Sequence, residues 1–561
     1  MMTISRLKPH KLAMCIVWIL TALWAVPSEG ADQDNPVPHL RKQGNATQLI
    51  VDGKPFLVLG GELHNSSSSS IEYMKPIWPK LVDANLNTVL AVVSWELTEP
   101  EEGKFDFTLV DGLIRNARSH HLRLILLWFG SWKNGVSTYV PVWVKTNLER
   151  FPRARDQNDK GLEILSTFSD ASRDADARAF AALMRHIRKV DGQQHTVIMV
   201  QVENEVGVLG DSRDRCDRCH AANDAFGKPV PKELMEYLQK HKDSLLPDVC
   251  DAWQAAGFKT SGTWEEVFGS NKPHDKDWRK RSFFTDEIFM AWHYARYVNR
   301  IVEAGKAEYP LPMFVNAWLD QEGYPQPGEF PSGGPLAHVM DIWRAGAPQI
   351  DMLCPDIYAP NFKERCEWYS QSGNPLFIPE TRGDGRGAVN VFYAIGQHDA
   401  IGFSPFAIER IAEPNSEIAR CYGVLSQIAP LILENQGKGA IAGVVLDAND
   451  PPEKLQLAGY TLEFKLARRW SFAAPECAAA IVISLGPDEF IAAGRGLSVS
   501  FSPNTPGPST VGIVSVDEGK FVDGRWTPGR RLNGDETMSG KGLLLPANAY
   551  SIQRVKLYRY H

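Results

Sequence analysis

The sequence predicts an α/β fold class: a (β/α)8 TIM barrel followed by a smaller all-β C-terminal domain. Short apolar segments alternate with amphipathic helical segments as far as about residue 435. Beyond residue 436 the helical periodicity stops, and short alternating segments separated by Gly, Pro and Asn-Gly continue to the C-terminus. A doubly wound sheet is the alternative, but it requires a glycine-rich phosphate-binding turn after an early strand, and no such turn is found there.

Length and composition limit the class of protein. A chain of 561 residues is too long for one core and indicates about two to four domains. The content of 43% hydrophobic and 23% charged residues is that of an ordinary globular protein. A net charge of −7 gives no reason to expect nucleic acid or an anionic membrane as a partner. The 16 tryptophans are many, and indole rings stack on sugar rings as well as filling cores.

Residues 1–30 have the pattern of a signal peptide. Arg6, Lys8 and Lys11 precede an apolar segment at 12–26, and small residues near Gly30 suit cleavage. We therefore expect an exported protein, periplasmic or secreted, without stable membrane association once the signal is removed. An uncleaved membrane anchor is the alternative, but the apolar segment is short for a spanning helix.

The barrel is predicted to begin within the first 100 residues and to extend from 31 to 435. A small hairpin turns at Asp52-Gly53 and leads into the first strand at 56–60. A helix at 74–84, a second strand at 87–95, a helix at 109–119 and a third strand at 122–128 follow.

The fourth strand carries the most informative stretch, Thr196-Val-Ile-Met-Val-Gln-Val-Glu-Asn-Glu-Val-Gly207. Its apolar residues are typical of a parallel strand buried on both faces. It ends in Glu203, Asn204 and Glu205, polar groups that a packed core does not accept unpaired. A carboxylate at the C-terminal end of a barrel strand indicates a catalytic residue, and an ion-paired structural glutamate is the alternative.

Residues 208–282 interrupt the alternation and are interpreted as an insertion above the strand ends, where specificity loops lie. They contain Cys216-Asp-Arg-Cys219, which is half of a zinc site or a local disulfide. No second CxxC or HxxxH follows at a useful spacing, so we expect a loop-bracing disulfide and no metal. Cys250 is a second candidate partner.

Four more strands complete the barrel at 313–318, 350–354, 375–379 and 400–404. A long amphipathic helix from about 284 to 302 precedes them, and helical segments near 337–346, 361–371, 387–398 and 415–434 alternate with or follow them. The accessory domain at 436–561 is predicted to contain strands at 479–484, 497–501 and 511–516.

The residues at the C-terminal strand tips converge on one bowl in such a barrel. They are carboxylates, amides and aromatic rings, without a Ser–His–Asp order, HExxH or a Gly-rich cradle. Aromatic platforms and hydrogen-bonding side chains suit a carbohydrate, and paired carboxylates suit cleavage of an acetal. The strand-tip residues are Glu62, His64, Trp95, Glu96, Trp128, Trp132, Asn204, Glu205, Asn316, Trp318, Asp356, Tyr358, Glu380, Arg382 and Glu409.

Glu205 and Glu380 are the predicted catalytic pair, because the fourth and seventh strands lie across the barrel from each other. An apolar environment would raise the pKa of Glu205 for proton donation, and Arg382 would hold Glu380 ionised. A buried ion pair between Glu380 and Arg382 is the structural alternative. The predicted substrate-binding residues are Asn204, His64, Trp95, Trp128, Trp132, Asn316, Trp318 and Tyr358, although a tryptophan near a strand tip is often core.

Three motifs resemble the retaining β-galactosidases of glycoside hydrolase family 35, in the bacterial branch with a C-terminal β-domain. They are Gly60-Gly-Glu-Leu-His64, Trp95-Glu-Leu-Thr-Glu-Pro-Glu-Glu-Gly-Lys-Phe-Asp-Phe107 and Gln201-Val-Glu-Asn-Glu-Val-Gly207. The resemblance implies that Glu205 is the acid/base, that Asn204 binds the sugar 2-hydroxyl and that Glu380 is the nucleophile.

The chain departs from that family at three places. Pro379-Glu380-Thr381 replaces a Ser-Glu-Phe-like context, and Phe129-Gly-Ser-Trp132 replaces a Cys-Ala-Glu-Trp run with a sugar-binding glutamate. Val92 or a neighbour replaces a pocket tyrosine. These changes leave the retaining chemistry intact but bear on the recognition of galactose.

The sequence therefore favours an exported retaining β-glycosidase that releases terminal β-galactose from plant-derived oligosaccharides and needs no cofactor. A glucosidase or arabinosidase on the same scaffold is the first alternative. A non-catalytic carbohydrate-binding protein is the second, and it predicts that one of the two glutamates lies outside the bowl.

Overall fold

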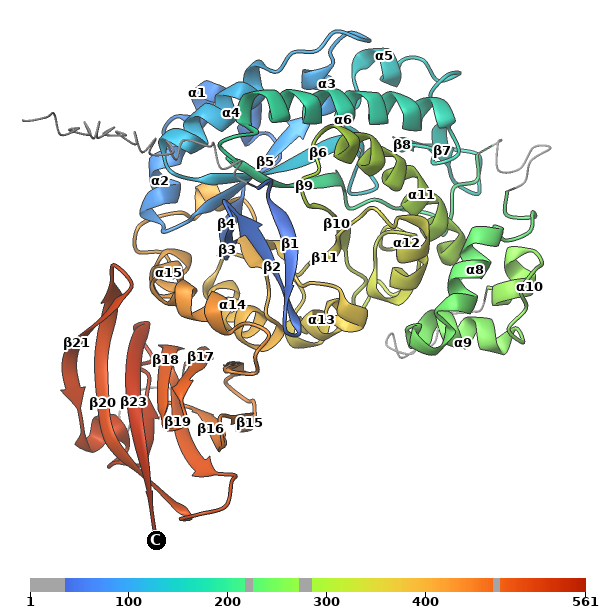
Figure 1. Cartoon of the computed structure of the whole chain (residues 1–561). Helices are drawn as coiled ribbons and strands as arrows, with labels where there is room; N and C mark the ends of the chain where they lie inside the picture. The colour runs from blue at the N-terminus through green and yellow to red at the C-terminus, as the bar shows by residue number, and fades with distance from the viewer. Residues whose placement is uncertain (1–35, 217–224, 272–284, 468–474) are drawn as a thin grey trace, which may run out of the picture. The chain divides into compact units, whose positions relative to one another are not determined.

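The computed structural model describes residues 36–216, 225–271, 285–467 and 475–561 (Figure 1). Within them the predicted (β/α)8 barrel followed by an all-β domain is confirmed. The predicted signal peptide at 1–30 and Cys219 lie outside the described residues. None of the described helices combines the length and apolarity that a membrane crossing requires.

The barrel is one sheet of eight parallel strands in the order β11-β10-β9-β6-β5-β4-β13-β12. It closes where Ile357 pairs with Thr381 and the peptide N–H of Ile357 donates to the carbonyl of Glu380 at 3.0 Å. Its strands are β4 (Val58–Glu62), β5 (Thr88–Ser94), β6 (Arg123–Lys133), β9 (Val197–Asn204), β10 (Met313–Trp318), β11 (Met352–Asp356), β12 (Ile378–Thr381) and β13 (Gly402–Pro405).

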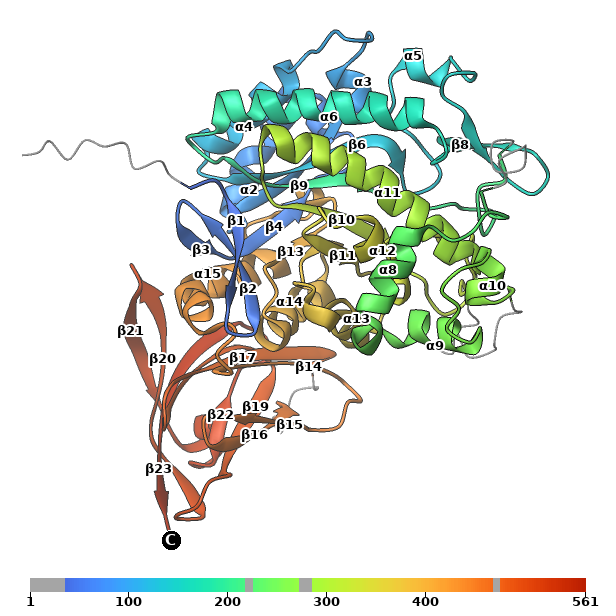
Figure 2. The ribbon, with the colours of Figure 1, turned by 45° about the vertical axis from the view of Figure 1, so that its right-hand side comes forward.

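Helices surround this sheet (Figures 1 and 2). They are α1 (Ile71–Met74), α2 (Ile77–Asp83), α4 (Thr108–Ser119), α6 (Asp170–Asp191), α11 (Thr285–Glu308), α12 (Met340–Gly346), α13 (Phe362–Tyr369), α14 (Gly385–His398) and α15 (Glu417–Asn435). The helix expected at 74–84 is divided into α1 and α2, because Pro76 has no N–H to continue the hydrogen-bond ladder.

Apolar side chains fill the inside of the barrel. Leu49 and Val51 of β2 belong to the same cluster, so the N-terminal three-stranded sheet packs against the barrel interior. That sheet consists of β1 (His39–Gln43), β2 (Ala46–Val51) and β3 (Lys54–Phe56). The inward residues include Val58, Leu90, Ile125, Leu127, Phe129, Ile198, Phe314 and Phe377. Ligands therefore have room only at the opposite, C-terminal ends of the strands.

The long loops at those ends carry short elements. The insertion contains α8 (Lys232–Lys240), α9 (Pro247–Ala255) and α10 (Trp264–Phe268), which lie together beside α12 in Figure 2. The remaining short elements before the β-domain are α3 (Trp95–Thr98), α5 (Val142–Lys145), β7 (Arg153–Arg155), β8 (Gly161–Leu165) and the 3₁₀ turns η1 (Ser67–Ser69), η2 (Lys242–Ser244), η3 (Ala337–Val339), η4 (Gln371–Gly373) and η5 (Ile408–Arg410).

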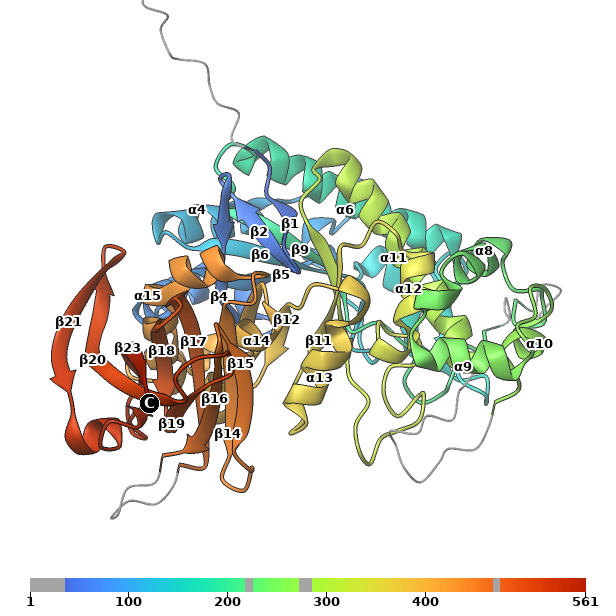
Figure 3. The same ribbon diagram turned by 60° about the horizontal axis from the view of Figure 1, so that its bottom comes forward.

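The C-terminal domain consists of two antiparallel sheets around their own apolar core (Figure 3). One sheet contains β14 (Ile441–Asp447), β17 (Cys477–Gly486), β18 (Glu489–Arg495), β23 (Ser551–Tyr560), β20 (Thr510–Val522) and β21 (Arg525–Leu532). The other contains β15 (Glu453–Leu457), β16 (Tyr460–Leu466), β19 (Leu497–Pro503) and β22 (Gly542–Leu544), and η6 (Gly534–Thr537) follows β21. Helix α14 packs on β14 and β17, and Arg495 bonds Glu417 of α15 at 2.6 Å, so the sandwich covers one flank of the barrel.

Candidate active site

The C-terminal ends of the barrel strands bring the two predicted catalytic glutamates together. Glu205 follows β9 directly, and Glu380 lies in β12. Oxygen atoms of Glu205, Glu380 and Asp356, the last residue of β11, lie within 4.8 Å of one another. We call the surrounding group the catalytic bowl, and it consists of Glu62, Lys133, Asn204, Glu205, Asp356 and Glu380.

Glu205 is held by its backbone and surrounded by charge. Its peptide N–H donates to Oδ1 of Asn316 at 3.0 Å, and its Oε2 lies 3.7 Å from Nζ of Lys133. Burial raises the pKa of Glu205 to about 7, and the charge of Glu380 adds to this rise while Lys133 opposes it. Such a carboxyl carries a proton that it can give up near neutral pH, as a general acid requires.

Glu380 accepts a hydrogen bond of 2.6 Å at Oε1 from the hydroxyl of Tyr358, a predicted site residue. Its other oxygen, Oε2, is buried and has no hydrogen-bond partner among the described residues. The prediction that Arg382 holds this carboxylate is wrong, because the guanidinium of Arg382 pairs with Asp384. Glu380 therefore keeps one oxygen directed by Tyr358 and one available to a ligand.

Two further carboxyl groups of the bowl have raised pKa values. Burial raises the pKa of Asp356 well above its usual value, and the charges of Glu380 and Glu205 raise it further. Burial likewise raises the pKa of Glu62, again with a contribution from Glu380. Asn316 donates to Oδ2 of Asp356 at 2.7 Å, which fixes the amide that also holds the backbone of Glu205.

Lys133 is the functional residue that the sequence interpretation missed. Burial opposes its charge, but Glu205, Glu380, Glu62 and Asp356 outweigh burial and raise the pKa of Lys133, which is therefore an ammonium. The third strand continues beyond Trp128 to Lys133, and its register against β9 shifts between these two residues. The only sign of Lys133 in the sequence was a lysine shortly after an apolar strand. The register shift breaks the alternation of inward and outward side chains along β6, so this alternation could not show that Lys133 faces the bowl.

Several buried polar atoms of the bowl have no protein partner. Both amide atoms of Asn204, both carboxyl oxygens of Glu62, and Oδ1 of Asp356 lack hydrogen bonds to the described residues. Buried polar groups are normally paired, so a cluster of such atoms marks a place where a polar ligand completes the hydrogen bonds. Sugar hydroxyls are both donors and acceptors and match this mixture.

Three of the tryptophans predicted to bind substrate lie outside the catalytic bowl. Trp95, Trp128 and Trp132 are fully buried and belong to the layer between the strands and the outer helices. Their ring N–H groups donate to Glu99 (2.8 Å), Asp176 (2.8 Å) and the carbonyl of Leu165 (3.0 Å), respectively. The expectation that these three rings bind substrate is wrong, because neighbouring strand residues point to opposite faces and these point outward.

The other predicted binding residues lie at the barrel mouth. His64 is half-buried with its ring 5.4 Å from that of Phe406, and its peptide N–H donates to Glu409 at 3.2 Å. Trp318 ends β10 beside Asp356 in the sheet register and is partly exposed. Tyr358 is 43% exposed although its hydroxyl reaches Glu380.

A second pair of carboxyl groups, Glu203 and Asp176, holds the strand ends that carry the bowl. Burial raises the pKa of Glu203 well above its usual value, and the charge of Asp176 and a hydrogen bond with Asp176 add to the rise. Glu203 also accepts the peptide N–H groups of Ser131 (3.2 Å) and Trp132 (2.9 Å). These bonds hold the end of β6, which carries Lys133, against the end of β9.

Replacing Glu203 with alanine should lower the free energy of unfolding by about 2–4 kcal/mol, since each buried N–H left without an acceptor costs about 1–3 kcal/mol. Glu203→Gln should lose less, because its amide oxygen can still accept one of the two peptide N–H groups while its NH2 group can donate to Asp176. Urea unfolding of the two variants measures the difference. Equal stability of Glu203→Ala and Glu203→Gln would contradict the assigned hydrogen bonds.

Parts of the chain are similar to known β-galactosidases. Residues 68–299 match the model of glycoside hydrolase family 42, described as Beta-galactosidase. Residues 418–543 match a domain family of unknown function, DUF5597. A β-galactosidase from Xanthomonas manihotis is 31% identical over 202 residues, which are 34% of this chain and 30% of that protein. The β-galactosidase GalA of Bacillus licheniformis is 24% identical over 250 residues, 43% of this chain and 32% of that protein.

The chain thus spans about a third of the length of the curated relatives it matches. Among solved structures, the cold-adapted β-galactosidase from Rahnella sp. R3 has a TM-score of 0.43 and 14% identity, covering 67% of this chain and 57% of that one.

The matched segments are similar to glycoside hydrolases. The matched family is more narrowly one of β-galactosidases. The matched family model is that of glycoside hydrolase family 42, whereas the sequence motifs resemble family 35. Membership of family 35 therefore stays a prediction.

Proposed function

We propose that the protein is a retaining β-glycosidase that removes terminal β-galactose from oligosaccharides, among them those of plant origin. One observation carries this proposal. Oxygen atoms of Glu205 and Glu380 lie within 4.8 Å of each other, and the pKa of Glu205 is about 7. Carboxyl groups about 5–5.5 Å apart are typical of retention, and inverting enzymes need about 6.5–9.5 Å.

In the first step, one oxygen of Glu380 attacks C1 of the galactosyl unit while Glu205 gives its proton to the departing oxygen. The hydrogen bond from Tyr358 directs the attacking carboxylate. In the second step Glu205, now ionised, takes a proton from water, and this water attacks C1 and frees Glu380. The unpaired amide of Asn204 is suited to bind the sugar 2-hydroxyl throughout.

The choice of galactose rests on the β-galactosidases that this chain resembles. One observation favours another exo-β-glycosidase, such as a glucosidase or arabinosidase, as second candidate. Where the resembling family has a sugar-binding glutamate after the third strand, this chain directs the ammonium of Lys133 at the bowl. A non-catalytic binding protein is disfavoured, because both glutamates share one bowl.

Hydrolysis of a panel of p-nitrophenyl glycosides tests this proposal. We expect the β-galactoside to have the highest kcat/KM, with the β-anomer of galactose as the first product seen by proton NMR. A preference for the β-glucoside or an arabinoside would establish the second candidate. Release of the α-anomer first would mean inversion and would exclude the double displacement.

Replacing Lys133 with methionine should move the alkaline limb of the kcat/KM profile, which we expect near pH 7, to higher pH. The positive charge of Lys133 lowers the pKa of Glu205, so its removal lets that pKa rise and keeps the acid protonated further into the alkaline range. Lys133→Arg keeps the charge and should keep the limb near its original pH. An unmoved limb in Lys133→Met would show that Lys133 does not act on the acid.

We also propose that the protein is exported, on the basis of the basic and apolar pattern of residues 1–30. Expression in a bacterial host followed by N-terminal sequencing of the protein outside the cytoplasm would test it. Cleavage near Gly30 is the expected result, and a protein retained inside with an intact N-terminus would contradict it.

A further inference from the structure

Glu62, the last residue of β4, is a carboxyl group of the catalytic bowl that the proposed double displacement does not use. Its side chain is 1% exposed, and neither Oε1 nor Oε2 has a hydrogen-bond partner among the described residues. Buried carboxyl oxygens are normally paired, because an unmet hydrogen bond in the interior costs free energy. Glu62 is therefore a candidate for a contact that only a ligand completes.

The carboxyl groups that surround Glu62 differ from it, because the protein itself engages each of them. Both oxygens of Glu409 lie 3.2 Å from the peptide N–H of His64, and one of them also accepts from the hydroxyl of Ser67 at 2.5 Å. The other carboxyl groups with at least one hydrogen bond or ion pair are those of Glu205, Asp356 and Glu380. Glu62 thus has both oxygens available where its neighbours have one or none.

The sheet fixes the backbone of Glu62 on both sides. Glu62 pairs with Leu90 of β5 on one side and with Phe406, which follows β13, on the other. Burial has the largest effect in raising the pKa of its carboxyl group, and the charges of Glu380, Lys133 and Glu205 act on it as well, so this group lies close to the catalytic pair. A carboxyl group held in this way selects its ligand by geometry, because it does not move to follow a poorer match.

Two free carboxyl oxygens suit two hydroxyl groups. An ionised carboxylate accepts from both hydroxyls, and a protonated carboxyl accepts from one and donates to the other. The unpaired amide of Asn204 ends β9, which β6 and β5 separate from β4, so Asn204 and Glu62 contact different parts of one ligand. Since Asn204 is assigned to the 2-hydroxyl, the hydroxyls left for Glu62 are those on C3, C4 and C6.

We propose that the carboxyl group of Glu62 binds two hydroxyl groups of the terminal sugar, other than the 2-hydroxyl, and so determines which sugar the bowl accepts. This inference rests on the proposed β-galactosidase function and deepens it, because it names the residue that recognises the sugar. A sugar that lacks either hydroxyl is then a poor substrate.

Monodeoxy substrates test the proposal. The parent is p-nitrophenyl β-galactoside, and three analogues lack the hydroxyl on C3, C4 or C6. We expect at least two analogues to lose about 10²-fold or more in wild-type kcat/KM, because each leaves an oxygen of Glu62 buried without a partner.

Variants of Glu62 then show whether this residue causes the losses. Glu62→Met has a similar volume and no hydrogen-bonding group, so removal of the same two hydroxyls should cost it less than about threefold further. Glu62→Gln keeps a donor and an acceptor and should retain part of the selectivity. Its Tm should not fall below that of the wild type, since no described hydrogen bond of the carboxyl group is lost.

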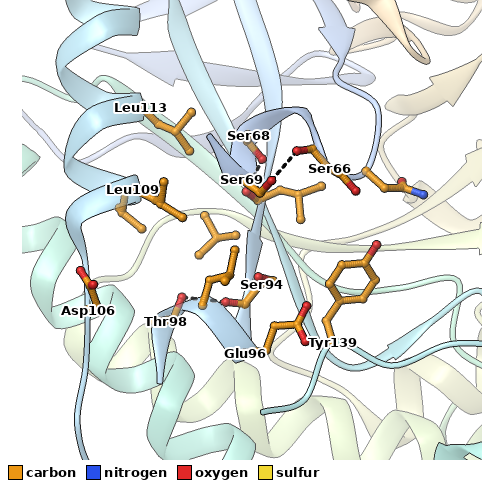
Figure 4. Close-up of a pocket in the computed structure, with 15 residues that line it drawn as sticks. Ser66, Ser68, Ser69, Ser94, Glu96, Thr98, Asp106, Leu109, Leu113 and Tyr139 are labelled. Carbon is orange, nitrogen blue, oxygen red and sulfur yellow. Dashed lines mark hydrogen bonds between the residues drawn. The ribbon is translucent and has the colours of Figure 1, made fainter. Parts of the chain in front are cut away.

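The end of the neighbouring strand offers a matched control. Glu96 lies in α3, directly after β5, and its carboxylate pairs with Lys145 at 3.0 Å. With Tyr139 it lines a separate pocket, whose described lining includes no residue of the catalytic bowl (Figure 4). In Glu96→Ala each deoxy analogue should lose the same factor relative to the parent as in the wild type.

Two results would overturn the assignment of Glu62 and leave the β-galactosidase proposal standing. One is that the analogues lose as much in Glu62→Met and Glu62→Gln as in the wild type, or that the wild type tolerates all three. The other is a marked fall in the Tm of Glu62→Gln, which would show a structural role. Failure of the wild type to hydrolyse the parent galactoside would instead refute the proposed function, and this inference with it.

Discussion

Glu380→Ala should lower kcat/KM for β-galactosides by at least about 10⁴-fold, because the variant has no group to form the covalent glycosyl-enzyme. The cavity left by the side chain admits small anions. With azide present we expect activity to return and an α-galactosyl azide to accumulate, since azide then attacks C1 from the side that Glu380 occupied. NMR of the azide product identifies the anomer.

Glu413→Ala is a matched control, because Glu413 is an exposed glutamate whose only described ion pair is with Lys80 at 3.0 Å. It should retain activity within about twofold of the wild type. Thermal unfolding of both variants separates a loss of chemistry from a loss of fold. Wild-type turnover by Glu380→Ala, or a fluorosugar trapped on another residue, would refute the choice of nucleophile.

Glu205→Ala should lower kcat by about 10²–10⁴-fold on substrates with poor leaving groups, which need a proton to depart. Substrates with an activated phenolate leaving group should lose much less in the first step, and the glycosyl-enzyme should then accumulate. Azide should give the β-galactosyl azide, because it attacks the intermediate from the side of the missing acid/base. Steady-state and burst kinetics on the two kinds of substrate measure this difference.

The same variant should lose the alkaline limb of the wild-type pH profile. In the wild type, raising the pH through about 7 removes the proton that Glu205 must donate, so the rate falls. Without Glu205 this proton donor is missing, so the limb that its ionisation produces should disappear. A limb that persists near pH 7 in Glu205→Ala would assign the proton donor to another residue.

The barrel was predictable because its signals are local. The largely apolar stretch from Val197 to Val202 is typical of a strand covered on both faces, and its polar end at Asn204 and Glu205 is visible in the sequence. The same reasoning located Glu380 at the end of the seventh strand. Consecutive strands of a barrel are neighbours, so strand number alone predicted that Glu205 and Glu380 would face each other.

The direction in which the tryptophan rings point was not predictable from the sequence. Trp95, Trp128 and Trp132 stand at strand tips, and the sequence does not state to which face a residue near a bulge or a strand end points. The structure directs all three outward, where their N–H groups find buried acceptors. Lys133 was missed for the same reason, because the register shift before it changes which residues of β6 face inward.

The sequence by itself determined the order of strands and helices, the all-β character of the second domain and the positions of the two predicted catalytic glutamates along the chain. The tertiary structure decided which side chains meet. Glu203 and Glu205 are two residues apart and would share a face of an ideal strand, yet left-handed φ angles of 62° and 45° direct them to opposite sides. That local turn is imposed by Asp176, the peptide groups of β6 and Asn316, which are distant in sequence, and no local pattern encodes it.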